Sequence, residues 1–213
     1  MKLTTKYHLD KLLEIHPELS IIKESLICGF DTMSHSFRNH GKLLVCGNGG
    51  SASDADHIVG ELMKGFMLNR PEDKFLAEKL NGYDDSGKLS NSLQLAFPAI
   101  NLSAHVALNT AICNDISSDM AFAQQVLGYG NEGDVLLGIS TSGNSKNVIN
   151  AAKVAKALGL ETIGLTGEDG GNMNELFDVL IKAPSIFTAS IQEMHLPIYH
   201  TLCAMLEEEF YGE

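Results

Sequence analysis

The stretch KLLVCGNGGSASDADHIVGEL, residues 42–62, joins an apolar run, a glycine-rich turn and a helical pattern in direct succession. The run Lys42–Cys46 has the length and the continuous apolar character of a strand that is covered on both faces. Gly47–Ser51 then provides a tight turn, and a helix is expected from Ala52 to Phe66. A strand, a turn and a helix in this order predict one unit of a parallel α/β sheet.

The same succession recurs further along the chain. Asp134–Ile139 (DVLLGI) leads through STSGNS into a helix predicted over Ser145–Leu158, and Glu161–Thr166 (ETIGLT) leads into the turn GEDGG. Asp178–Ala183 (DVLIKA) precedes a last helix predicted over Ala189–Glu209. Repetition of this unit predicts the fold class, which is a doubly wound parallel α/β sheet with helices on both faces.

Two segments lie outside this repeated pattern. Residues 5–40 have apolar side chains at three- and four-residue spacings, which predicts N-terminal helices that break at His16-Pro17. Residues 67–95 are polar and contain Pro71, which predicts a long surface loop, either a tolerated insertion or a lid over an active site. No second domain is evident, so residues 1–213 are expected to form a single domain.

Composition excludes several classes of partner. The 213 residues are 44% apolar and carry a net charge of −12, and an acidic surface repels phosphate backbones and anionic lipids. Neither nucleic acid nor a membrane is therefore expected as a partner, and no signal peptide or clean membrane-spanning stretch is evident. The cysteines lack any paired spacing and are expected to be reduced, buried thiols of a cytoplasmic protein. They are Cys28, Cys46, Cys113 and Cys203.

Two loops follow predicted strands at the edge where open parallel sheets bind their ligands. Ser140–Ser145 offers four hydroxyls in six residues, with Gly143 for tight curvature and a helix beginning directly afterwards. Donors at this density beside a helix N-terminus suit a phosphate group, and the alternative is an ordinary serine-capped helix. In Gly47–Ser51, Asn48 could hold a sugar hydroxyl while Gly49 and Gly50 let the backbone approach the ligand.

Nucleotide chemistry is not indicated by these loops. The hydroxyl-rich loop is not a GxGxxG motif, and no GxxxxGK[ST] motif occurs in the chain. We therefore expect no nucleotide cofactor.

Candidate acid–base groups lie on two predicted helices. His57 and Glu61, four residues apart, share one face of the helix after GNGGS and could enter one site, although a surface ion pair has the same spacing. In SIQEMHLPIYH, Gln192 and His200 are separated by roughly 12 Å along a helix. Pro197 removes a backbone donor between them and could bend this helix. On spacing alone, ordinary packing is the simpler explanation for one of the histidines.

Together these pieces resemble the sugar isomerase (SIS) domain family, and within it the phosphoheptose isomerases. The matching strings are CGNGGSASDADHIVGEL, GDVLLGISTSGNSKNVI, LTGEDGG and IQEMH followed by His200, and the resemblance extends over residues 5–210. Asn114-Asp115 also fits the ND pair that the family carries ahead of the phosphate loop. The resemblance implies a SIS-type, flavodoxin-like three-layer sandwich.

The resemblance also implies an activity. Members of this family interconvert the ketose and aldose forms of a phosphorylated sugar, here most directly sedoheptulose 7-phosphate and D-glycero-D-manno-heptose 7-phosphate, through a cis-enediol. Such products are precursors of lipopolysaccharide or capsule. The family forms homotetramers whose active sites lie between subunits.

Residue roles follow from the same resemblance. The acid–base positions fall on Glu61 and His200, and the zinc-binding positions fall on His57, Glu61, Gln192 and His200. The substrate-binding positions are Asn48, Gly49, Gly50, Ser51, Asn114, Asp115, Ser140, Thr141, Ser142, Ser145 and Gln192.

Two alternatives stay open at this point. The segment Lys74–Ser92 is longer than the family's usual connection, and Ala189-Ser190 stands where the family has a polar, often acidic residue, so another sugar phosphate could be the substrate. A non-catalytic relative, a tetrameric regulator that binds the bacterial replication initiator, shares the scaffold but lacks counterparts of Glu61 and His200. Because both residues are present here, the sequence favours an enzyme.

Overall fold

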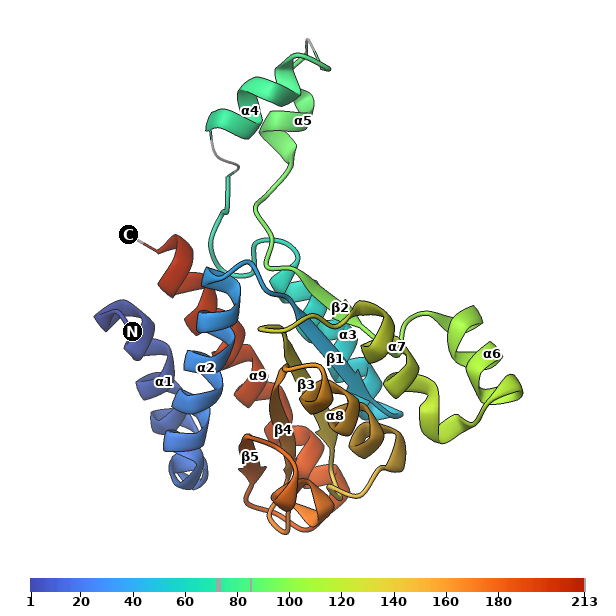
Figure 1. The fold of residues 1–213 in the computed structure, drawn as a ribbon. Helices are drawn as coiled ribbons and strands as arrows, with labels where there is room; N and C mark the ends of the chain where they lie inside the picture. Colours follow the sequence, from blue (N-terminus) through green and yellow to red (C-terminus); the bar gives the residue numbers. More distant parts are fainter. Residues whose placement is uncertain (72–73, 85, 213) are drawn as a thin grey trace.

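The computed structural model describes residues 1–71, 74–84 and 86–212. Its centre is a parallel five-stranded sheet with helices on both faces (Figure 1). The strands are β1 (Leu43–Gly47), β2 (Ala99–Asn101), β3 (Val135–Ser140), β4 (Glu161–Gly167) and β5 (Val179–Ala183). The helices are α1 (Leu3–Ile15), α2 (Lys23–Arg38), α3 (Gly50–Leu62), α4 (Lys74–Asn81), α5 (Lys88–Ser92), α6 (Val106–Asp115), α7 (Ala121–Tyr129), α8 (Lys146–Ala157) and α9 (Thr188–Tyr211), with short 3₁₀ helices η1 (Pro17–Ile22), η2 (Ser118–Met120) and η3 (Gly171–Glu175).

Alternate residues of each strand face two separate apolar layers, because side chains of a strand point in turn to its two sides. Leu43 and Val45 of β1 join a core with α1, α2, α3 and α9. Leu44 and Cys46 join a second core with α7 and α8. The central strands are buried along their whole length, as the continuous apolar runs predict. The predicted three-layer α/β architecture is confirmed.

The strand order is β2-β1-β3-β4-β5, the doubly wound order in which the direction of winding reverses between β1 and β3. These two strands pair in register from Leu43↔Val135 to Gly47↔Ile139. The loops that follow them therefore leave the sheet side by side at the switch point, where this class of sheet binds ligands. Among the strands of the described residues, β2 alone was not expected from the sequence, because three residues after Pro98 are too short a run to show a pattern.

The predicted N-terminal helices are present, and the break falls where proline predicts it. Helix α1 ends at Ile15, η1 begins with Pro17 in its first turn, and α2 follows. Helices α1 and α2 both pack against α9. Several apolar residues of α9 are buried in this arrangement, among them Ile198 and Leu202.

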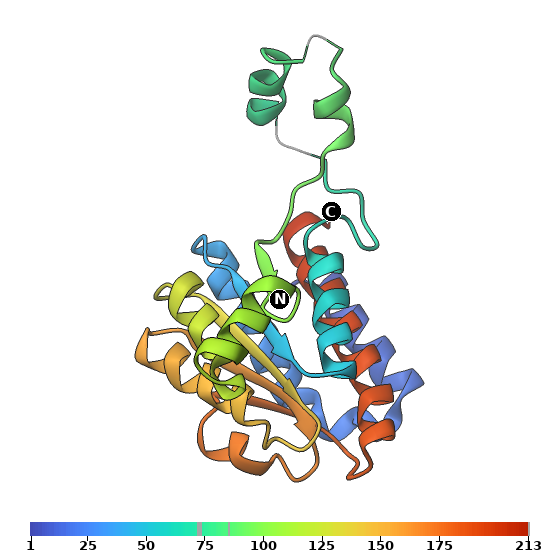
Figure 2. The ribbon, with the colours of Figure 1, turned by 90° about the vertical axis from the view of Figure 1, so that its right-hand side faces the viewer.

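Residues 67–95 differ from the predicted surface loop. They contain α4 and α5, which project from the body as a helical arm (Figures 1 and 2). Pro71 and Gln94 form an isolated antiparallel bridge at the base of this arm. The sequence KFLAEKL favours a helix because it consists mostly of strong helix formers. The prediction was also wrong at Arg70, which is fully buried rather than at the surface.

The cysteines fit the expectation only in part. Cys46 and Cys203 are buried, whereas Cys28 and Cys113 are exposed, because they lie on the outer faces of α2 and α6. All four are free thiols. Among the helices in the described part of the chain, none combines the length and apolar character needed to cross a membrane.

Candidate active site

The loop after β1 depends on a backbone conformation that suits glycine. Gly49 has φ of 57° and ψ of −121°, which residues with a Cβ rarely adopt. This turn brings the Ser51 amide to the Asn48 carbonyl at 3.1 Å and starts α3 at Gly50. The Asn48 side chain exchanges two hydrogen bonds with Asn147 of α8, at 3.0 and 2.8 Å. The pair of amides ties the loop after β1 to the helix after β3.

The loop after β3 presents its hydroxyls without using them as a helix cap. The Ser140 and Ser145 hydroxyls lie 2.9 Å apart, and Ser145 makes no side-chain capping hydrogen bond to α8. Gly143 has φ of 65°, and a Cβ there would come within 2.1 Å of the Gly170 carbonyl oxygen. The loop therefore packs tightly against the turn after β4 that contains Gly170. The N-terminus of α8, which is the positive end of its helix dipole, lies directly after the loop.

Thr141 and Ser142 of this loop line a cavity of about 210 Å³. Its other walls come from the turn after β4 and from the start of α9, including Glu168, Asp169 and Thr188. Gln192 lies at the same end of the molecule, because a Cβ on Gly50 would come within 2.5 Å of its side-chain nitrogen. We call this region, made of residues 48–51, 140–145 and Gln192, the loop end.

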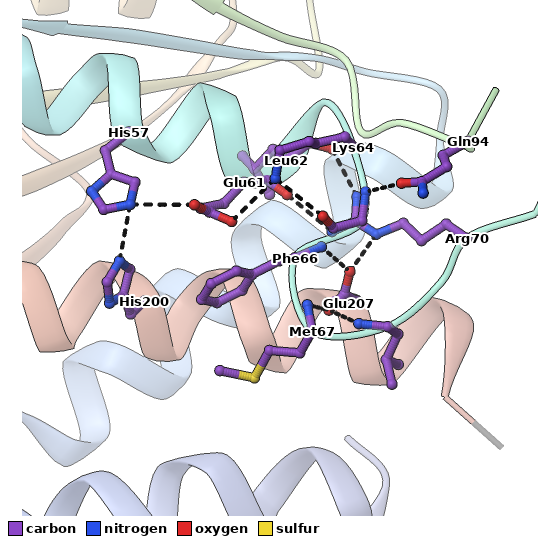
Figure 3. A network of polar contacts seen from close by, with 12 residues as sticks. His57, Glu61, Leu62, Lys64, Phe66, Met67, Arg70, Gln94, His200 and Glu207 are labelled. Carbon is purple, nitrogen blue, oxygen red and sulfur yellow. Dashed lines mark hydrogen bonds and ion pairs between the residues drawn. The ribbon is translucent and has the colours of Figure 1, made fainter. Parts of the chain in front are cut away.

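His57, Glu61 and His200 meet at the opposite end of α3 (Figure 3). The His57 Nε2 atom lies 3.2 Å from Glu61 Oε1 and 3.3 Å from His200 Nε2. The Glu61 side chain is 14% exposed. Burial lowers the pKa of His200, the neighbouring His57 lowers it further, and Glu61 opposes both. We call these three residues the carboxylate end.

The two ends are separated along α3 and α9. Gly50 and Glu61 are eleven residues apart on α3, or roughly 16 Å, and Gln192 and His200 are roughly 12 Å apart on α9. Within one chain, Gln192 therefore lies beside Gly50 and not with the two histidines. His200 instead lines a groove of about 250 Å³ between α1 and α9, which shares no residue with the cavity at the loop end.

The donors at the carboxylate end suit zinc in type. Two atoms bound tetrahedrally to one zinc ion at about 2.0–2.1 Å lie roughly 3.3 Å apart, which matches both separations from His57 Nε2. A closed ligand set is not formed: within residues 1–71, 74–84 and 86–212, no group of three or more His, Cys, Asp or Glu side chains is arranged to hold a metal ion. The residues fit a zinc ion in chemistry and pairwise spacing, and zinc binding stays a prediction.

A buried tyrosine contacts the His57 ring at Nδ1, the nitrogen that does not face Glu61 and His200. The Tyr199 hydroxyl lies 3.0 Å from His57 Nδ1 and 3.4 Å from Asp54 Oδ1. Burial raises the pKa of Tyr199. Burial also raises the pKa of Asp54, although the hydrogen bond from Tyr199 and the charge of His57 lower it in part. Sequence reasoning did not single out either residue, although Asp54 lies within the stretch that decides the fold.

A buried ion pair fixes the end of α3 on which Glu61 stands (Figure 3). Arg70 donates to Glu207 Oε1 at 2.6 Å and to the carbonyl oxygens of Leu62 and Glu61 at 2.8 and 3.1 Å. The Glu207 carboxylate also accepts three backbone amides from residues 66–68. Nothing in the sequence marked Arg70, because it lies in a polar run and precedes Glu207 by 137 residues.

Asn114 and Asp115 are not brought to either end. They lie exposed at the last turn of α6, and the Asn114 amide donates to the Asp115 carboxylate at 2.8 Å. Their place among the substrate-binding residues stays a prediction.

A doubly wound sheet with two glycine- and hydroxyl-rich loops at its switch point places the chain in the class of SIS-domain proteins, and the SIS domain family matches residues 83–167. The phosphoheptose isomerase of Helicobacter pylori (strain P12) is 41% identical over 208 residues, covering 98% of this chain and 93% of that protein. The structure of the phosphoheptose isomerase from Neisseria gonorrhoeae has a TM-score of 0.74 at 34% identity, covering 95% of this chain and 96% of the other. The Francisella tularensis phosphoheptose isomerase has a TM-score of 0.73 at 32% identity, covering 94% and 98%. The chain belongs to the phosphoheptose isomerase family.

Proposed function

We propose that this chain isomerises sedoheptulose 7-phosphate to D-glycero-D-manno-heptose 7-phosphate. The observation that carries the proposal is the Glu61 carboxylate, which is largely shielded from water and lies 3.2 Å from His57, whose ring in turn contacts His200. A carboxylate placed in this way can act as a general base toward a carbon acid. The membership of the chain in the phosphoheptose isomerase family supports the same reaction.

The reaction is an internal proton transfer and needs no external reductant or oxidant. The substrate phosphate binds among the hydroxyls of Ser140–Ser145 at the N-terminus of α8. Glu61 takes a proton from C1 of the open-chain ketose, which leaves a cis-enediol, and the proton returns to C2. His200 moves the proton between the two oxygens. Each positioned acid or base contributes about 10²–10⁴-fold to the rate.

Zinc at the carboxylate end, held by His57, Glu61 and His200 and completed by Gln192, would polarise the sugar carbonyl. Gln192 of the same chain lies at the loop end, so the glutamine ligand would have to come from another copy. A metal bound to Glu61 also competes with its role as base. We therefore assign the proton transfer to the protein side chains.

The separation of the two ends supports a site shared between copies. In one chain, Ser142 and His200 line different cavities with no common residue. A second copy that docks its loop end against the carboxylate end of the first would bring phosphate and base to one substrate. We propose that the chain works as a homotetramer with active sites at its subunit interfaces.

The cellular setting follows from the reaction. The heptose phosphate product suits the synthesis of lipopolysaccharide or capsule precursors, and the four free thiols suit the reducing cytoplasm.

A coupled assay across a panel of ketose phosphates tests the proposal. Sedoheptulose 7-phosphate should be turned over fastest, and Glu61→Gln should reduce kcat by about 10²–10⁴-fold while leaving phosphate binding intact. The matched control is Glu24→Gln on the exposed side of α2, which should behave like the unmodified protein. Faster turnover of another ketose phosphate would favour the alternative substrate. Near-normal kcat in Glu61→Gln would refute the assignment of the base.

A further inference from the structure

The side chains of Asn48 and Asn147 form a closed pair of amides between the two loops of the switch point. Asn48 Nδ2 donates to Asn147 Oδ1 at 3.0 Å, and Asn147 Nδ2 donates back to Asn48 Oδ1 at 2.8 Å. Asn48 follows β1, and Asn147 lies in the first turn of α8, which follows β3. Asn48 is exposed and Asn147 is half-buried, so the pair lies at the surface, on the edge where this class of sheet binds ligands.

A backbone amide decides which end of the Asn147 side chain is the oxygen. The two ends of an asparagine amide have nearly the same shape, and hydrogen-bond partners distinguish the oxygen from the nitrogen. The backbone nitrogen of Val148 lies 3.0 Å from Asn147 Oδ1. A backbone N–H can only donate, so the atom that faces it must be the Asn147 oxygen. This N–H belongs to the first turn of α8, where backbone amides have no carbonyl partner within the helix.

The orientation of Asn147 then fixes that of Asn48. The Asn147 oxygen accepts one hydrogen from Asn48, and the Asn147 nitrogen donates to the Asn48 oxygen. Turning the Asn48 amide over would set oxygen against oxygen and N–H against N–H, which loses both hydrogen bonds. Asn48 Nδ2 carries two hydrogens, and within residues 1–71, 74–84 and 86–212 one of them has a partner and the other is free.

We propose that Asn147 is a positioning residue that keeps the Asn48 oxygen occupied and leaves one Asn48 N–H free to donate to an oxygen of the sugar phosphate. The proposal rests on the proposed function, which places the substrate at the loop end. It gives a direction to the Asn48 hydrogen bond and a role to Asn147, neither of which the motifs or the resemblance assigned.

A double-mutant cycle separates this role from direct contact with the substrate. Asn147→Ala frees the Asn48 amide to rotate, and Asn48→Ala removes that amide. Each should raise the KM for sedoheptulose 7-phosphate about 2- to 10-fold with kcat close to normal, which is the effect of one neutral hydrogen bond. Because Asn147 acts through Asn48, the double variant should have the KM of Asn48→Ala alone. Factors that multiply would show that Asn147 contacts the substrate itself and would overturn the inference.

Asn150→Ala is the matched control for this cycle. Asn150 also lies on α8, and its side chain donates to the Asp119 carbonyl oxygen at 3.1 Å and not to Asn48. The KM of this variant should be unchanged. A rise equal to that of Asn147→Ala would mean that any asparagine lost from α8 has the same effect, and the amide pair would then have no special role.

NMR of ¹⁵N-asparagine-labelled protein gives a readout that needs no turnover. In the ligand-free protein, the two Nδ2 hydrogens of Asn48 should resonate further apart than in Asn147→Ala, because the hydrogen bond shifts one of them. Added sedoheptulose 7-phosphate should move the signal of the free hydrogen and leave the paired one in place. An unchanged separation in Asn147→Ala, or loss of the paired signal when the sugar binds, contradicts the inference.

Failure of this inference can be told apart from failure of the proposed function. Calorimetry measures whether the unmodified protein binds sedoheptulose 7-phosphate. Protein that binds the sugar with the expected shifts but does not turn it over leaves the inference standing and refutes the proposed function. Protein that turns the sugar over while the two substitutions multiply has the opposite meaning, and protein that does not bind the sugar overturns both.

Discussion

The loop end and the carboxylate end of α3 hold their functional groups by different means. At the loop end, neighbouring residues set the geometry: Gly49 and Gly143 allow the turns, and the hydroxyls of Ser140–Ser145 follow one another in sequence. At the carboxylate end, the surroundings of Glu61 include residues far away in the chain, Glu207 and Tyr199. Arg70 and Glu207 fix the end of its helix, and Tyr199 supports its neighbour His57.

The proposed function assigns different work to the two ends. A phosphate is held by backbone groups and short side chains that need little support, so a compact local motif is sufficient. A general base must be placed within hydrogen-bond reach of one particular carbon, which requires a rigid helix end and a fixed neighbour. The two ends therefore fail in different ways when they are altered.

Mixing two inactive variants gives the largest expected effect. Glu61→Gln damages only the carboxylate end, and Ser142→Ala/Ser145→Ala damages only the loop end. If each active site takes its two ends from different copies, subunits exchanged between these variants form some sites with both ends intact. Activity at low substrate concentration should then rise at least about tenfold above that of either parent, given that the base alone accounts for about 10²–10⁴-fold.

The control for this experiment mixes Glu61→Gln with His200→Ala, which alter the same end. No shared site of this pair has an intact carboxylate end, so its activity should stay low. Equal recovery in both mixtures, or none in either, would contradict a site shared between copies.

Arg70→Ala should give the largest loss of stability. It leaves the Glu207 carboxylate, 1% exposed, as an unpaired buried charge, which typically costs about 3–5 kcal/mol of the free energy of unfolding. Arg38→Ala is the matched control, because the Arg38–Glu209 ion pair has a half-exposed arginine and should contribute below about 1 kcal/mol. Urea unfolding of both variants measures the difference. Similar losses would show that burial does not distinguish the two ion pairs.

The same contrast explains how much of the molecule could be predicted from sequence. The parallel sheet, the switch-point loops and the pairing of His57 with Glu61 follow from patterns that span a few residues each, and the structure contains all three. Strand β2 is too short to carry a pattern, and the helices of the arm lie within a polar run.

Tertiary contacts could not be predicted in this way. The resemblance placed Gln192 and His200 in the same zinc site, whereas the fold places Gln192 beside Gly50. The two residues lie eight positions apart on one continuous helix, which keeps their side chains separated within one chain. Arg70 contacts Glu207 and Tyr199 contacts His57 only in the folded chain, because each pair is more than 130 residues apart. No spacing within a short stretch of sequence indicates these contacts. These contacts are therefore known from the structure, whereas the motifs could be identified from the sequence.

Acid should remove the stabilisation that the Glu207 carboxylate gives to the fold. Burial alone would raise the pKa of Glu207, but three backbone amides and Arg70 outweigh it and hold this pKa below its ordinary value of 4.5. A depressed folded-state pKa contributes stability that is present above the unfolded-state pKa and is lost as the pH falls through the folded-state pKa.

The free energy of unfolding of the unmodified protein should therefore exceed that of Glu207→Gln most strongly near neutral pH. The difference between the two should shrink as the pH falls below about 4.5. Urea unfolding at a series of pH values measures it. A difference that stays constant from neutral pH into this range would show that the charge of Glu207 does not stabilise the fold.

Ser142→Ala should change binding without changing chemistry. The Ser142 hydroxyl lines the cavity of the loop end and accepts only the Asn144 amide at 3.2 Å in the described residues, so its hydrogen remains available to a phosphate oxygen. Loss of one hydrogen bond to a charged group should raise KM about 10- to 100-fold and leave kcat close to normal. Ser20→Ala in η1 is the control, since its hydroxyl donates to the Pro17 carbonyl and faces no ligand loop. A fall in kcat at unchanged KM would mean that Ser142 acts on the reacting carbons, and the division of labour between the two ends would then be wrong.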